Sequence, residues 1–259
     1  CNELLRLDFS AEEFAKLAEE RSLSAESIEA VSSVFEYLRD KKEQSTIQML
    51  LRTSRLPQKQ VKTFDNFDFD VLKGKDIDKL KNLQTLAPIY AHKNIAFIGP
   101  PGTGKTHLAQ AFGYECCRHR MKTYFIKAAE LRDKFTIARR AGREGALLTS
   151  LVRPSCLIID EVGHCEFDKA NTRLFFDMVD RRYNKEGAFN MIFTSNKNPS
   201  DWREIFGEND ALLCSLDRLF DSASVFTFRG ESFRGKHLEN YTLRAEHSAS
   251  TTQDNPLNH

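Results

Sequence analysis

The sequence predicts an α/β fold in which a five-stranded parallel sheet is flanked by helices. Short apolar runs typical of buried strands alternate with longer segments of helical periodicity across residues 93–240. A glycine-rich loop also follows the first of these runs and opens a helix, as loops do in strand–loop–helix units of parallel sheets. Ahead of this region, residues 1–57 are expected to form a small all-helical domain, and residues 58–92 a connector.

The glycine-rich loop has the spacing of a phosphate-binding loop: Gly, four residues, Gly, Lys and Thr. A predicted strand, residues 95–98, precedes it, and a predicted helix, residues 107–120, follows it. Glycines let the backbone bend so that its N–H groups point at phosphate oxygens, and the helix N-terminus adds partial positive charge. The residues expected to contact a nucleotide are Gly99, Pro100, Pro101, Gly102, Thr103, Gly104, Lys105, Thr106 and His107.

Two further sequence features predict which residues bind the phosphates and Mg²⁺ and which residue activates the attacking water. Lys105 can bring its ammonium group to the β- and γ-phosphates, and the Thr106 hydroxyl can bind Mg²⁺. The apolar run at 156–159 ends in Asp160 and Glu161, which places two carboxylates at the carboxyl edge of the sheet, where such sheets bind ligands. We expect Asp160 to hold Mg²⁺ directly or through water, and Glu161 to polarise the water that attacks the γ-phosphate.

A polar stretch ends the fourth predicted strand, residues 189–193. A side chain placed there can reach the attacking water and the γ-phosphate. Asn196 is the first choice for this role, and Thr194 and Ser195 are alternatives. The fifth strand is predicted at 225–228, after a short helix at 212–220.

The N-terminal part carries helix signals. Ser10 and Glu13 have the spacing of a capping box, and a second helix is expected to start after Ser24 and to end before Pro57. Its apolar residues form either the core of a small domain or a docking face for a partner. In the connector, Phe64, Phe67 and Phe69 either pack beside the nucleotide base or anchor the connector to the core, and residues 79–90 are expected to form an amphipathic helix.

Residues 129–141 are predicted to be helical and are rich in basic side chains. They lie between two core strands, where insertions are tolerated. Either this helix presents an exposed face balanced by acidic neighbours, or it contacts the DNA backbone. The basic residues are Arg132, Lys134, Arg139, Arg140 and Arg143.

The amino-acid composition limits which kinds of core, partner and compartment are expected for this protein. Of the 259 residues 41% are hydrophobic, which is enough for a sizeable core, and the formal net charge is only +1, so any DNA-binding surface must be local. No apolar stretch is long enough to span a membrane, so no membrane partner is expected. The six cysteines lack metal-site spacing and are expected to be reduced, in a cytoplasmic protein. Residues 241–259 are expected to form a disordered tail.

The order of these motifs resembles the AAA+ branch of P-loop ATPases. The segments NIAFIGPPGTGKTHLAQAFG, LIIDEVG, DRRY, TSN, LDRL and RGESFRGK together resemble IstB, the helper ATPase of insertion-sequence transposition, whose close relative is the helicase loader DnaC. The resemblance implies a sheet in which the Asp-Glu strand does not neighbour the P-loop strand. It further implies a Mg²⁺-dependent ATPase that assembles as a homo-oligomer on duplex DNA without sequence preference and assists a cognate transposase in target capture.

By the same resemblance, Arg218 in LDRL matches an arginine finger acting in the next subunit's site, and Arg234 matches the sensor-two arginine acting in its own subunit. Phe233 and Gly235 depart from the usual residues of the family beside Arg234. Two other functions compete with the helper ATPase. A DnaC-type helicase loader would use the same catalytic residues with another partner. A nucleotide-binding scaffold would not hydrolyse ATP and would not need Glu161.

Overall fold

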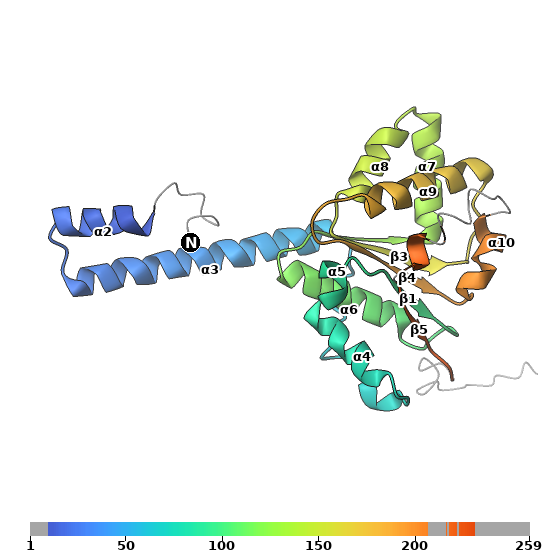
Figure 1. Cartoon of the computed structure of the whole chain (residues 1–259), viewed down its shortest axis with the longest axis horizontal. Helices are drawn as coiled ribbons and strands as arrows, with labels where there is room; N and C mark the ends of the chain where they lie inside the picture. The colour runs from blue at the N-terminus through green and yellow to red at the C-terminus, as the bar shows by residue number, and fades with distance from the viewer. Residues whose placement is uncertain (1–9, 207–215, 217, 222, 231–259) are drawn as a thin grey trace, which may run out of the picture.

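A computed structural model of the chain describes residues 10–206, 216, 218–221 and 223–230. Its centre is a five-stranded sheet whose neighbours all run parallel, in the order β2-β3-β4-β1-β5 (Figure 1). The strands are β1 (Ile95–Ile98), β2 (Thr123–Lys127), β3 (Cys156–Val162), β4 (Asn190–Ser195) and β5 (Ser224–Thr227). Strand β4 separates the P-loop strand β1 from the Asp-Glu strand β3, which confirms the expected topology.

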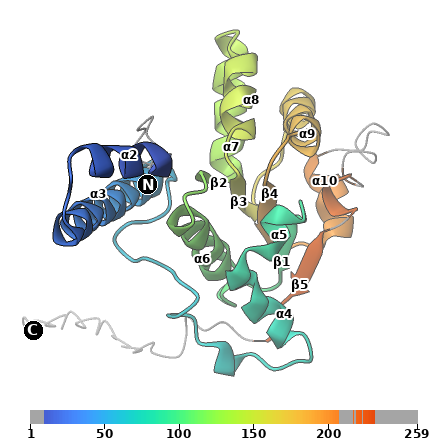
Figure 2. The ribbon, with the colours of Figure 1, turned by 60° about the vertical axis from the view of Figure 1, so that its left-hand side comes forward.

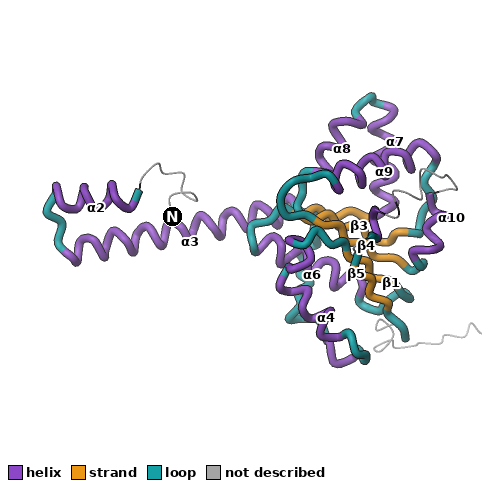
Figure 3. The backbone as a smooth tube through the Cα atoms, in the orientation of Figure 1, coloured by secondary structure: helices purple, strands orange, loops and turns teal. Residues whose placement is uncertain are grey.

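Helices cover both faces of the sheet, so successive residues of a strand enter two different cores. Ala96 and Ile98 pack into the first core, and Ile95 and Phe97 into the second. Figures 1 and 3 show the two helical layers on opposite sides of the strands. The layer over the first core contains α7 (Ala128–Arg140), α8 (Glu144–Val152), α9 (Lys169–Tyr183) and α10 (Trp202–Phe206). The opposite layer contains α6 (Lys105–Arg118), α4 (Ile77–Lys81) and α5 (Ala87–Tyr90).

Two parts of the sequence prediction need correction. The single helix expected at 79–90 is wrong: α4, a 3₁₀ turn (Asn82–Thr85) and α5 replace it. The break comes at Leu86, which adopts a left-handed conformation with φ 59° while its side chain is almost completely buried. Strand β4 also extends through Ser195, so Thr194 lies inside the strand rather than after it.

Helix α8 was not predicted, and it forms a hairpin with α7 between β2 and β3 (Figure 2). The hairpin returns to the sheet beside Arg182, whose side chain is fully buried. Its guanidinium donates to five backbone carbonyl oxygens, at 2.7 to 3.2 Å, in the last turn of α8, the loop that follows it and the first residue of β4. Burial lowers the pKa of Arg182 to about 10, so it remains charged at neutral pH.

The N-terminal helices are α2 (Ala11–Glu20) and α3 (Ala25–Thr53), and we call them together the arm. The predicted capping box is confirmed, because the Ser10 and Glu13 side chains each accept the other residue's backbone N–H. Figures 1 and 2 show α2 folded back along α3, with the pair projecting away from the sheet. Leu50 alone is buried within these two helices, so the pair by itself does not enclose a core.

The base of the arm is joined to the edge strand β2. The Phe125 N–H donates to the Ser54 carbonyl oxygen at 2.8 Å, and Leu50 and Leu56 pack into the second core. Arg55 extends this contact through an ion pair with Glu130 on α7. Within the described residues, no helix has both the length and the apolar character required to cross a membrane.

Candidate nucleotide-binding site

The phosphate-binding loop lies between β1 and α6, as predicted, and α6 starts at Lys105. Gly104 caps this helix with φ 89°, a left-handed conformation that favours glycine. A Cβ added here would lie 2.7 Å from Cε2 of Phe67, so the connector closes against the loop at this point. Only a residue without a side chain therefore fits both the turn and the packing.

The loop lysine is held by its own loop. The Lys105 Nζ donates to the carbonyl oxygens of Gly99 at 2.7 Å and Pro100 at 2.6 Å, and the side chain is buried. These carbonyls keep the ammonium group at the mouth of the loop, where it can exchange backbone oxygens for phosphate oxygens with little movement.

A buried carboxylate connects the loop to the neighbouring strands. Asp160, 1% exposed, accepts hydrogen bonds on one carboxylate oxygen from the hydroxyls of Thr106 at 2.8 Å and Thr194 at 2.5 Å. Since β4 lies between β1 and β3, Thr194 is the residue that stands beside Asp160 at this edge of the sheet. A hydroxyl and a carboxylate oxygen in contact are hard oxygen donors of the kind that Mg²⁺ takes from proteins, so Thr106 and Asp160 fit the metal role expected of them.

Glu161 follows in an unusual conformation. Its φ is 60°, its N–H donates to the Thr194 hydroxyl at 3.0 Å, and its carboxylate forms an ion pair with Lys127 Nζ at 3.0 Å. Lys127 ends β2 and stands in register with Asp160 of β3. The Glu161 carboxylate pairs with Lys127, whereas that of Asp160 accepts from Thr106 and Thr194, so the two acids have different partners.

The three candidates at the end of β4 have different contacts. Thr194 bonds both Asp160 and Glu161, whereas the Ser195 hydroxyl donates to the Val162 carbonyl at 2.6 Å. The exposed Asn196 places its amide nitrogen 2.9 Å from Nε2 of His164. The structure thus brings Thr194 to the acidic pair and places Asn196 beside a histidine in the loop that follows β3.

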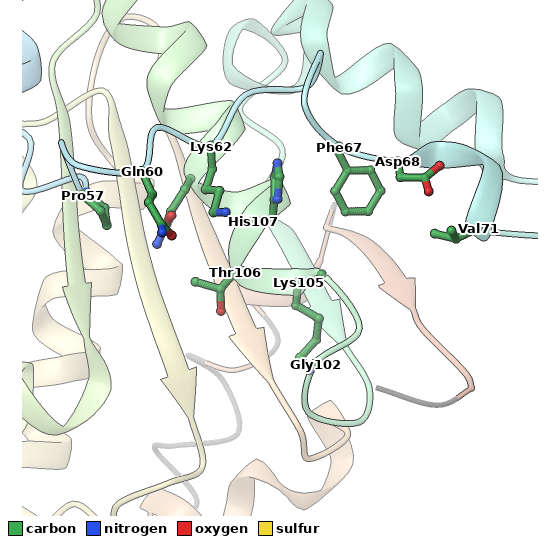
Figure 4. A pocket seen from close by; sticks show the side chains of 12 residues that line it. Pro57, Gln60, Lys62, Phe67, Asp68, Val71, Gly102, Lys105, Thr106 and His107 are labelled. Atoms are coloured by element: carbon green, nitrogen blue, oxygen red, sulfur yellow. The ribbon is translucent and has the colours of Figure 1, made fainter. Parts of the chain in front are cut away.

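Residues of the connector line one side of a cavity of about 590 Å³, and the phosphate-binding loop and the start of α6 line the other (Figure 4). His107 faces the cavity, and its Nε2 lies 2.9 Å from the Thr63 carbonyl oxygen. Burial lowers the pKa of His107, so the ring is neutral at neutral pH; because a carbonyl only accepts, Nε2 carries the proton. Figure 4 shows Lys62 reaching into the same space beside Thr106 and His107.

The connector aromatics serve as anchors. Phe64 and Phe67 are buried in the second core, and the Phe67 ring meets His107 edge-on with centroids 5.0 Å apart. Phe69 packs edge-on against Phe67 at 4.8 Å. Of these three rings, Phe67 also lines the cavity, so anchoring and a contact with a nucleotide are compatible at this position.

Of the two arginines predicted from the resemblance, Arg218 lies away from this site. Arg218 forms an ion pair with Asp180 on α9 at 2.8 Å, and the carbonyl of the adjacent Leu219 accepts from Asn94, which precedes β1. Arg218 therefore lies at the edge of the sheet opposite its own P-loop. Arg234 falls outside the described residues.

The five basic candidates on and after α7 differ in their partners. Arg139 bonds Asp168 and Asn171 at the start of α9, and Arg132 pairs with its neighbour Asp133. Lys134 lies 4.0 Å from Glu130. Arg140 and Arg143 are exposed, and among the described residues neither has a carboxylate within ion-pair distance.

Sequence reasoning missed two contacts of the site. Lys127 could have been found by aligning the ends of β2 and β3, since parallel neighbours finish at the same edge. The contact between His107 and Thr63 could not be predicted in this way. It uses a backbone carbonyl, which every residue has, so no residue type in the connector indicates it.

Comparison with known proteins finds relatives among the ATP-binding proteins of insertion sequences. An ATP-binding protein of insertion sequence IS5376 from Geobacillus stearothermophilus is 40% identical over 196 residues, covering 74% of this chain and 75% of that protein. Its counterpart from insertion sequence IS21 of Pseudomonas aeruginosa is 32% identical over 204 residues, covering 79% of this chain and 75% of that protein.

Solved structures share the fold of the sheet and its helices. The AMPPCP-bound DnaA of Aquifex aeolicus superimposes with a TM-score of 0.54 at 21% identity, covering 67% of this chain but only about half, 51%, of that one. The DnaC helicase loader superimposes with a TM-score of 0.51 at 18% identity, covering 63% of this chain and 97% of that one. The P-loop fold of AAA+ proteins is thereby confirmed.

One family accounts for both the motifs and the fold. The family model of IstB-like ATP-binding proteins matches residues 3–240, a range that includes the arm, the connector and the sheet. The chain therefore belongs to the family of IstB-like ATP-binding proteins.

Proposed function

We propose that this protein hydrolyses ATP, assembles with copies of itself on duplex DNA, and assists the transposase of its insertion sequence in capturing target DNA. The observation that carries the enzymatic part is the hydrogen-bonded set formed by Thr106, Asp160, Thr194 and Glu161 beside the phosphate-binding loop. The names of the relatives, ATP-binding proteins of insertion sequences, support the transposition part.

In the proposed reaction, the oxygen of a water molecule bonds to the γ-phosphorus, the bond from that phosphorus to the β–γ bridging oxygen breaks, and ADP leaves with the electron pair. Glu161 takes the proton of the attacking water. Lys105 exchanges the carbonyls of Gly99 and Pro100 for phosphate oxygens. Thr106 and Asp160 would hold Mg²⁺, which supplies charge neutralisation for the phosphates.

Arg218 is proposed to complete the site of a neighbouring copy. The link between Leu219 and Asn94 supports this, because Asn94 precedes β1 and the P-loop follows it. A four-residue strand spans roughly 13 Å, so Arg218 serves a second copy more readily than its own P-loop. The proposed DNA contacts reduce to Arg140 and Arg143, the basic residues of the α7–α8 hairpin that are exposed and unpaired within the described chain.

The test compares phosphate release by the wild type and by Glu161→Gln, with and without duplex DNA and the transposase. The variant is expected to bind ATP normally and to lose about 10²-fold or more in turnover, the usual contribution of a positioned base. Sedimentation on duplex DNA with a non-hydrolysable ATP analogue should show a larger assembly than with ADP. Equal turnover of the two proteins would remove Glu161 as the base, and a monomer on DNA would remove the proposed assembly.

The partner is tested separately by pull-down. The ATP-analogue complex on DNA should retain the transposase and should not retain a replicative helicase. Retention of the helicase instead would replace transposition with helicase loading.

A further inference from the structure

We propose that Asp180 is a positioning residue that sets the direction of Arg218 toward the neighbouring copy's ATP. This inference rests on the proposed role of Arg218 and goes beyond it, since it gives a task to the first residue of the DRRY segment. The contact that carries it is the ion pair between Arg218 and the Asp180 carboxylate at 2.8 Å.

The backbone on either side of Arg218 is held by the core. Leu216 and Leu219 are buried, and Phe220 packs against Trp202 with ring centroids 5.2 Å apart. Asn94 donates to the Leu219 carbonyl at 2.9 Å and accepts the Met191 N–H at 2.8 Å. The backbone next to Arg218 is thus connected by hydrogen bonds, through Asn94, to strand β4.

The partner of Arg218 is held just as firmly. Asp180 lies in the last turns of α9, and two residues later Arg182 fixes that end of the helix through its five carbonyl contacts. The position of the Asp180 carboxylate is therefore well defined relative to the sheet. The carboxylate pairs with an arginine whose side chain is 49% exposed.

Geometry and energetics together favour positioning over stabilisation. The pair is well exposed on both sides, at 49% and 39%, and such surface pairs contribute little to folding. Catalysis by contrast is sensitive to placement, because a displacement of about 1 Å in a group that contacts the transition state costs up to about 10²-fold. The pair can therefore orient Arg218 without being needed for folding, and catalysis is where its loss should be detected.

The chain offers a matched control on the same helix. Asp177 accepts two hydrogen bonds from Arg181, at 2.7 and 2.9 Å, within one exposed turn of α9. Asp177→Asn removes an equivalent carboxylate one turn earlier without touching Arg218. Neither aspartate belongs to the nucleotide site of its own chain.

The experiment mixes two full-length proteins on duplex DNA and measures phosphate release. Donor subunits carry Glu161→Gln, so they present Arg218 but do not turn over ATP. Acceptor subunits carry Arg218→Ala, so they keep Glu161 but lack the arginine. Turnover recovered by mixing reports on sites in which a donor's Arg218 faces an acceptor's ATP.

Adding Asp180→Asn to the donor should lower the recovered turnover about tenfold, while adding it to the acceptor should leave it unchanged. Asp177→Asn in the donor should also leave it unchanged, and Asp180→Glu in the donor should restore part of the loss. ATP affinity and thermal stability of each variant should match those of its parent.

Two sets of results overturn the inference alone: full or increased recovery with the Asp180→Asn donor, or an equal loss when the same change is in the acceptor. Full turnover by Arg218→Ala without any mixing overturns the inference together with the proposed role of Arg218. The two failures are distinguishable because only the second appears in the unmixed protein.

Discussion

Glu161 has a backbone conformation that residues with side chains rarely adopt. A left-handed φ of 60° costs roughly 1–2 kcal/mol for such a residue, and the hydrogen bond from its N–H to the Thr194 hydroxyl offsets part of this cost. The same hydroxyl donates to Asp160. The Thr194 hydroxyl thus contacts both acidic residues of the site. The sequence around Thr194 does not predict these contacts.

Thr194→Val is expected to slow ATP turnover about tenfold or more, because the isosteric change removes both hydrogen bonds and frees the Glu161 turn. Thr194→Ser keeps the hydroxyl and should retain most of the activity. Phosphate release at saturating ATP measures the effect. A valine variant as fast as the serine variant would show that the hydroxyl does not organise the acids.

Lys127 restrains the other end of Glu161. An exposed ion pair of this kind contributes up to about 1 kcal/mol, which corresponds to about fivefold in rate if the carboxylate must leave it before accepting a proton. Lys127→Met is therefore expected to raise DNA-independent ATP turnover by up to about fivefold. Lys134→Met, which loses only a 4.0 Å contact with Glu130, is the control. Slower turnover in Lys127→Met would mean that the lysine supports the reaction.

At the scale of elements, one side chain holds the α7–α8 hairpin to the sheet. Arg182 donates to carbonyls at the end of α8 and at the start of β4, so it substitutes for the backbone donors that these chain ends lack. No carboxylate accompanies it among its described partners, so its charge is balanced by carbonyl dipoles alone.

Arg182→Met is expected to destabilise the fold by about 3 kcal/mol or more, since it leaves several buried carbonyls without a donor. Arg181→Met removes the adjacent, exposed arginine and should change the free energy of unfolding by less than about 1 kcal/mol. Urea unfolding followed by circular dichroism compares the two. Similar losses in both variants would contradict the role given to the buried guanidinium.

The exposed side of the same hairpin is where DNA contact is expected. Arg140→Glu and Arg143→Glu should each weaken binding to duplex DNA and should each reduce the slope of log affinity against log salt by about 1, the effect of one lost phosphate contact. Arg173→Glu on α9 is the matched control, an exposed arginine outside the hairpin. An unchanged slope in the first two variants would take the hairpin out of the DNA interface.

At the scale of the molecule, the sheet and its loop were predictable because their signals are local. Strand β1 begins and ends where its apolar run does, and Lys105 opens the helix that the glycine spacing requires. Order within the sheet required the family resemblance, because apolar runs alone do not say which strands are neighbours. The role of Thr194 depends on that order, and this is why Asn196 looked the stronger candidate from sequence.

The arm shows the opposite limit of sequence reasoning. Its helices and its cap at Ser10 were predictable from residue spacing, yet α3 is a 29-residue helix of about 44 Å that leaves Tyr37 63% exposed and Met49 56% exposed. Periodicity identifies which side of a helix is apolar but not what covers it. Whether this surface meets a partner therefore stays a prediction.

The placement of Arg218 has a consequence for how any chain of copies would end. If Arg218 completes the site of a neighbouring copy as proposed, copies join head to tail through unlike surfaces, because the P-loop and Arg218 lie at opposite edges of the sheet. Unless such a row closes on itself, its last member has no neighbour to complete its site. ATP bound at that end would be hydrolysed last. The assembly would therefore have a direction, and its end would persist longer than its interior.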